Sequence, residues 1–102
     1  MPDPETLYAD LAATHLQIER VSTGRMLKSD ALTIDGKSYA YLSEGGLVVK
    51  LPKARVTELV EDGTGEALRV GARVMREWVV VPFDHKDQWP ELMQSALEFV
   101  RG

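Results

Sequence analysis

The sequence predicts an α+β domain of two layers, an antiparallel sheet with helices packed on one face. Three observations support this class: tight-turn sequences join short alternating segments, amphipathic segments flank them, and 44% of the 102 residues are hydrophobic. The predicted order is helix, three strands, helix, two strands, helix, written α-β(3)-α-β(2)-α. The length predicts a single domain over residues 1–102.

The first helix is expected over residues 3–19. Asp3 is a favourable N-cap residue, and Pro4 suits the first helical position. Apolar side chains recur at helical spacing along one face, and a histidine among them is interpreted as a residue at the edge of the core rather than a ligand. This face consists of Leu7, Tyr8, Leu11, His15 and Ile18.

Strands are expected next, at residues 24–29, on both sides of a hairpin at 31–43, and at 47–51. Asp35-Gly36 is the preferred residue pair for a type I′ turn, with alternating residues on both sides. Residues 43–46 form the following turn. These connections predict that the strands pair in antiparallel fashion.

The second half of the chain is expected to contain a helix over 52–62, strands near 65–71 and 73–81, and a last amphipathic helix. Pro52 opens the second helix, and Gly63 is placed to end it. The last helix has an i, i+3, i+4, i+7 series of apolar side chains. The series consists of Trp89, Leu92, Met93, Ala96, Leu97 and Val100.

The stretch "DHKD" at residues 84–87 has two interpretations. Asp84, His85 and Asp87 are candidates for a metal or acid–base site, but a metal needs three or four converging ligands. The favoured interpretation is a strand-to-helix connection, in which Asp87 caps the last helix or the helix starts at Trp89. We therefore expect no catalytic residues, no metal site and no cofactor.

The formal net charge is −4 and the chain contains no cysteine. Nucleic-acid binders usually carry a basic excess, so broad DNA binding is disfavoured, although a local basic patch remains open. No segment approaches the ~20 apolar residues that span a bilayer, and the N-terminus lacks the apolar run of a signal peptide. We expect a cytoplasmic protein that does not bind membranes.

A candidate anion or partner site lies at the start of the second helix, where Lys50, Lys53 and Arg55 crowd together. A helix N-terminus presents free N–H groups and favours anions. Cations at this end oppose the usual dipole preference, which indicates either a surface for an acidic group or an ordinary solvated surface.

A candidate interface lies on the strand at 73–81, which is apolar on both faces near its end. Helices in a two-layer fold cover only one face of the sheet. We therefore expect Trp78 and Val80 to lie at an interface, and a homodimer is one prediction for it. The alternative is a monomer in which Trp78 is partly exposed.

Several of these segments together resemble a known family. The segments "GRML", "IDGKSYAYL", "LVVKLPKARVTELVEDGTGE" and "VMREWVVVP", followed by the amphipathic helix with Trp89, are similar to the N-terminal domain of TfoX/Sxy proteins and to the small YjbR/MmcQ-like domains. The resemblance implies a fold like that of type III secretion chaperones and a bacterial origin. The helical second domain of the family would be absent, since the chain stops at Gly102. The matching positions are Arg25, Met26, Gly36, Lys50, Arg55 and Trp78, whereas Leu27-Lys28 replace the usual Phe-Gly.

Three functions are compatible with these features. The first is a non-enzymatic protein-interaction or regulatory module. The second is a nucleic-acid-associated regulator of the competence type, which needs a basic face. The third is a small ligand-binding domain or enzyme, which needs a concave pocket with converging polar groups. The residues of the basic face would be Arg25, Lys50, Lys53, Arg55, Arg73 and Arg76.

Overall fold

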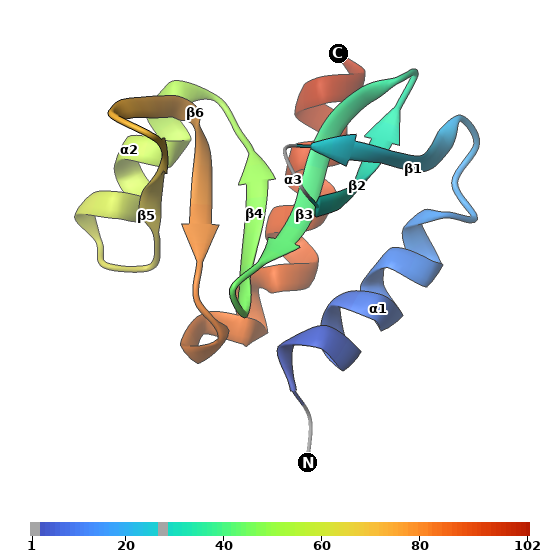
Figure 1. Cartoon of the computed structure of the whole chain (residues 1–102), viewed down its shortest axis with the longest axis horizontal. Coiled ribbons are helices and arrows are strands. Elements are labelled where there is room, and N and C mark those ends of the chain that lie inside the picture. Colours follow the sequence, from blue (N-terminus) through green and yellow to red (C-terminus); the bar gives the residue numbers. More distant parts are fainter. Residues whose placement is uncertain (1–2, 27–28) are drawn as a thin grey trace.

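A computed structural model describes residues 3–26 and 29–102. It has the expected two layers: a six-stranded antiparallel sheet in the order β1-β2-β3-β4-β6-β5, and three helices (Figure 1). The elements are α1 (Pro4–His15), β1 (Val21–Met26), β2 (Ser29–Ile34), β3 (Lys37–Ser43), β4 (Gly46–Lys50), α2 (Lys53–Glu61), β5 (Glu66–Val70), β6 (Arg73–Val81), the 3-10 helix η1 (Phe83–Gln88) and α3 (Trp89–Arg101).

The sheet has one strand more than the order α-β(3)-α-β(2)-α allows, although the individual segments expected before the second helix already number four. Residues 24–29 do not form one strand, because β1 ends at Met26 and β2 begins at Ser29. Leu27 and Lys28 lie outside the described residues. β1 starts at Val21, whose side chain is buried in the core.

Both predicted tight turns are confirmed. Asp35 and Gly36 have φ angles of 52° and 80°, and Glu44 and Gly45 repeat this pattern at 50° and 80°. Two successive residues with positive φ define the type I′ turn that matches the twist of antiparallel strands. These turns set the β2–β3 and β3–β4 pairings.

Helix α1 begins as expected but ends at His15, so the predicted extension to residue 19 was wrong. The Asp3 carboxylate accepts a hydrogen bond of 2.7 Å from the Thr6 N–H. After His15 the chain must reach the β2–β3 turn, where the Arg20 carbonyl accepts from the Asp35 N–H at 3.3 Å. Arg20 adopts a φ of 73°, which an α-helix does not allow. The Arg20 conformation and its contact with Asp35 therefore set the path of the chain from α1 into β1.

Helix α2 ends at a Schellman motif. The Thr64 N–H donates to the Leu59 carbonyl at 3.0 Å and the Gly63 N–H to the Val60 carbonyl at 3.3 Å. Gly63 has a φ of 85°, which confirms that it is the residue that ends the helix. At the other end, Pro52 is the N-cap instead of the first helical residue.

The main core lies between the sheet and the helices. This core contains Leu47 and Val49 of β4 and Leu51, the residue after it. All three helices pack on this side of the sheet. The other face carries a smaller cluster formed by Ala31, Tyr41, Val48 and Trp78, with Leu68, Met75 and Val80 around it. Figure 1 shows that β1 runs across the direction of β4 and β6, so the sheet is strongly twisted.

A bulge in β3 adjusts the core near α1. Leu32 pairs with Ala40 and Thr33 with Ser38, so Tyr39 is an extra residue without a partner on β2. Both Tyr39 and Ala40 consequently belong to the helix-side core. The Tyr39 hydroxyl lies 2.8 Å from Nδ1 of His15 at the end of α1.

The connection from β6 to α3 is the 3-10 helix η1. α3 starts at Trp89 with Gln88 as its N-cap residue, and no side chain caps it. Of the two expected starts, the one at Trp89 is confirmed and capping by Asp87 is wrong. Pro90 in the first turn favours this start, because it lacks the N–H that would need a partner.

Candidate binding cleft

The most irregular part of the sheet is an expanded bulge in β6. Ala67 of β5 pairs with Val79, but the next residue, Leu68, pairs with Met75. Arg76, Glu77 and Trp78 therefore have no partner on β5. Trp78 pairs instead with Lys50 of β4, and the Glu77 carbonyl accepts from the Leu51 N–H at 3.0 Å. Bulges of this kind redirect side chains at sheet edges.

Two adjoining cavities open around this bulge, and together we call them the Trp78 cleft. Both are lined by Lys50, Glu77 and Trp78. The first, of about 510 Å³, extends between the sheet and the last turns of α3, and its other lining residues are Lys37, Ser38, Phe99 and Val100. The second, of about 580 Å³, extends towards α2, and its other lining residues are Lys53, Arg73, Val74, Met75 and Arg76.

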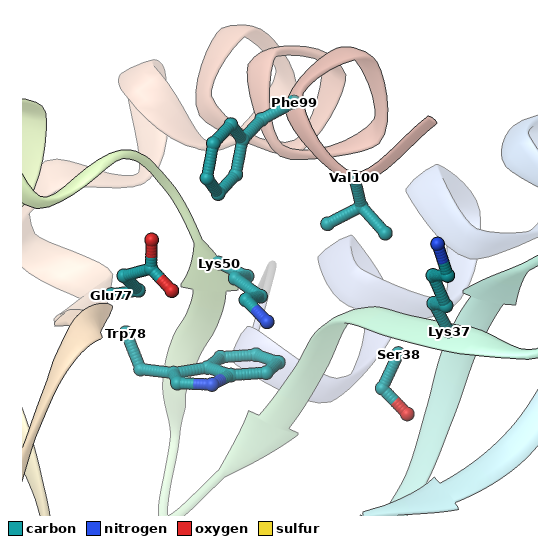
Figure 2. A pocket seen from close by; sticks show the side chains of 7 residues that line it. All are labelled: Lys37, Ser38, Lys50, Glu77, Trp78, Phe99 and Val100. Carbon is teal, nitrogen blue, oxygen red and sulfur yellow. The ribbon is translucent and has the colours of Figure 1, made fainter. Parts of the chain in front are cut away.

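Figure 2 shows how the first cavity is assembled. Phe99 and Val100 reach into it from α3, and Lys50 lies in the middle. Glu77 and Trp78 border it on the side of β6, while Lys37 lies opposite at the start of β3. Five segments of the chain thus contribute to the Trp78 cleft: β3, β4, the N-terminus of α2, β6 and α3.

The Trp78 cleft is strongly basic although the chain is acidic. It holds five of the chain's 12 lysine and arginine residues but only one of its 16 carboxylates, Glu77. All ion pairs among the described residues involve Arg20, Arg25 or Arg55, so none neutralises a cation of the cleft. A concave surface lined by one sign of charge concentrates its field and attracts opposite charge. The five cations are Lys37, Lys50, Lys53, Arg73 and Arg76.

Trp78 forms a fixed floor for these charges. Its side chain is only 5% exposed, and its ring centroid lies 5.9 Å from that of Tyr41. The ammonium group of Lys50 lies 5.9 Å from the indole centroid, within the range of a cation–π contact. The indole therefore holds the Lys50 head group in the cleft without neutralising its charge.

The start of α2 adds to the positive potential. Pro52 offers no side-chain cap and the first turn contains no acidic residue. The N–H groups of Arg55 and Val56 donate to the Pro52 carbonyl, which leaves those of Lys53 and Ala54 without a backbone acceptor in the described part of the chain. The partial positive charge of the helix N-terminus thus lies beside Lys50 and Lys53.

The structure brings together only part of the predicted patch. Lys50 and Lys53 lie in the Trp78 cleft, whereas Arg55 pairs with Glu58 on the surface of α2. Of the predicted basic face, Arg73 and Arg76 join them, but Arg25 pairs with Asp30 at 4.0 Å. Trp78 lies in the floor of the cleft, and Val80 is half-buried on the same face of the sheet.

Sequence reasoning missed Lys37, Glu77 and Phe99 as cleft residues. The two tight turns contain a signal for Lys37, because hairpin pairing places the start of β3 and the end of β4 at the same end of the sheet. Glu77 reaches the cleft through the bulge in β6, and Phe99 through the docking of α3. Both depend on contacts between distant segments, which no local pattern shows.

The "DHKD" stretch lies apart from the Trp78 cleft. Asp84, His85 and Asp87 belong to η1, and neither cavity of the cleft is lined by them. Within residues 3–26 and 29–102, no three histidine, aspartate or glutamate side chains converge as metal ligands would. The described residues also include no helix with the length and apolar character needed to cross a bilayer.

Comparison of the chain with protein-family models, with curated proteins and with solved structures gave no match.

Proposed function

We propose that the chain is a non-enzymatic interaction module that binds an acidic protein partner in the Trp78 cleft. The observation that carries this proposal is the concentration of five cations without ion-pair partners on a chain of net charge −4. Like charges repel when they are crowded, and an acidic partner relieves this repulsion on binding. We also propose that the protein is cytoplasmic and that it is related to the TfoX/Sxy N-terminal domains.

Nucleic acid is the second candidate partner, because Lys50, Lys53, Arg73 and Arg76 of the proposed basic face do converge. Two features favour a protein. Single-stranded nucleic acids are commonly bound by stacking on exposed aromatic side chains, and Trp78 is 5% exposed. The acidic remainder of the chain also repels a long polyanion.

The proposal is tested by capture of partners from an extract of the source cells. Lys53→Glu combined with Arg76→Glu reverses two exposed cations of the cleft. Arg20→Glu combined with Arg25→Glu makes the same change of net charge elsewhere, at residues whose side chains are 58% and 70% exposed. We expect the wild type and the control to retain the same proteins, which increasing salt releases, and the cleft variant to lose them.

Two results would contradict the proposal. Equal retention by the cleft variant and the control would show that the Trp78 cleft is not the binding site. Capture of nucleic acid alone, with a steep salt dependence and loss in the cleft variant, would establish the second candidate instead.

A further inference from the structure

A second groove adjoins the Trp78 cleft on the side of α2. It lies between α2 and the β5–β6 hairpin and has a volume of about 300 Å³. We call it the valine groove, because Val60 and Val74 line it together with Thr57, Glu61 and Ala67. Its remaining lining residues are Lys53 and Arg76, which also line the Trp78 cleft. The two depressions are therefore continuous.

The valine groove exposes an unusual share of the apolar surface. Only three large hydrophobic side chains of the described residues are exposed: Leu16 at 44%, Val60 at 40% and Val74 at 37%. Two of these three lie in this one groove. Exposed apolar side chains that gather in a depression with a polar rim are typical of a contact surface.

We infer that the Trp78 cleft and the valine groove recognise one acidic peptide segment, whose carboxylates lie in the cleft and whose large aliphatic side chain lies in the groove. The inference rests on the proposed function and specifies its partner. The occupant follows from charge complementarity, because a segment that spans both depressions passes Lys53 and Arg76, which line both of them. A nucleic acid satisfies the cations but offers little apolar surface to cover the valines.

The arrangement specifies the order of residue types in the partner. Lys53 and Arg76 lie at the boundary of the two depressions, so carboxylates next to the aliphatic residue contact them. Further carboxylates reach Lys50 and Arg73, which line the Trp78 cleft but not the valine groove. The aliphatic residue therefore stands at one end of an acidic run.

The test uses fluorescein-labelled nine-residue peptides made of glutamate and serine. One leucine replaces each serine in turn, and the reference is the glutamate–serine peptide without leucine. Partial burial of a leucine side chain stabilises the complex enough for about fivefold tighter binding. We expect the wild type to prefer the leucine peptide by about this factor at one end of the acidic run, as measured by fluorescence anisotropy.

Variants assign this preference to the groove. Val60→Ser and Val74→Ser remove exposed apolar groups. We expect them to abolish the leucine preference while the glutamate–serine peptide without leucine still binds. Leu16→Ser is the matched control, since Leu16 is the third exposed large hydrophobic and lies outside the groove. It is expected to keep the preference.

The possible failures are distinguishable. If leucine and serine peptides bind equally at every position, or if Val60→Ser and Val74→Ser keep the preference, the inference is overturned while the proposed function stands. If no acidic peptide binds, the inference is overturned, and the capture experiment with the cleft variant decides the proposed function. Binding of a single-stranded oligonucleotide in that case identifies nucleic acid as the partner.

Discussion

The contact between His15 and Tyr39 shows how single residues couple distant elements. Nδ1 of His15 lies 2.8 Å from the Tyr39 hydroxyl, and the histidine is 5% exposed. Burial lowers the pKa of His15. Burial, and then Asp30, raise the pKa of the nearby Tyr8 to about 12, so this phenol stays neutral at physiological pH. The contact between His15 and Tyr39 fastens the end of α1 to the bulge in β3.

The lowered pKa of His15 predicts a loss of stability at acidic pH. The pKa is below 6.5 in the folded protein and close to 6.5 in the unfolded chain, so the unfolded chain binds the proton first as the pH falls. Well above about pH 6.5 His15 is neutral in both states, and its effect on the pH dependence of stability vanishes. We expect the free energy of unfolding in urea to fall more for the wild type than for His15→Gln between about pH 7.5 and pH 5. An identical fall would show that His15 is not responsible.

At the scale of elements, the features that a short stretch of sequence determines were predictable. The Asp35-Gly36 turn, the Asp3 cap and the amphipathic face of α3 each depend on residues a few positions apart. The features that depend on distant contacts were not predictable. The path from α1 into β1 includes the contact of Arg20 with Asp35, and the bulges follow from strand pairing. Lys50 and Lys53 were predictable as a site because they are neighbours in the chain, whereas Phe99 was not.

Gly65, which lies just before β5, gives a prediction for the pairing of β5 with β6. An added Cβ at Gly65 would lie 2.6 Å from Cγ2 of Val79 and 3.0 Å from the Val80 carbonyl oxygen. Because the carbonyl belongs to the sheet, Gly65→Ala must displace β5 or β6. We expect a loss of about 1–3 kcal/mol in the free energy of unfolding, measured in urea.

Gly36→Asn is the control for Gly65→Ala. Nothing lies within 4 Å of an added Cβ at Gly36, and asparagine tolerates its positive φ of 80°. We expect a much smaller loss of stability there. Equal losses in the two variants would mean that the close approach of β5 and β6 at Gly65 does not limit the fold.

At the scale of the whole molecule, charge is distributed unevenly around the fold. Segments that are far apart in the sequence place five cations in the Trp78 cleft, while the chain as a whole has a net charge of −4. Such an asymmetry orients an acidic partner before contact and makes association sensitive to salt. The net charge disfavoured broad DNA binding and left a local basic patch open, and the three-dimensional arrangement adds Lys37, Arg73 and Arg76 to Lys50 and Lys53 of the patch that the sequence had singled out.

The burial of the helix-free face leads to a prediction about oligomeric state. The homodimer was expected because a two-layer fold leaves one sheet face uncovered. In the structure, however, Tyr41, Val48 and Trp78 are 2%, 0% and 5% exposed within a single chain. The centre of the expected interface is therefore already covered within one chain, whereas Val80 at its side stays half-buried. We expect sedimentation velocity at micromolar concentration to show a monomer.

A dimer in that experiment would contradict this prediction, and two variants would locate its interface. If Lys53→Glu combined with Arg76→Glu dissociates it, an acidic surface of a second copy occupies the Trp78 cleft. If Val60→Ser dissociates it while the charge variant does not, the valine groove alone holds the contact. Either result would make a second copy a competitor of the acidic partner, because both would need the same surface.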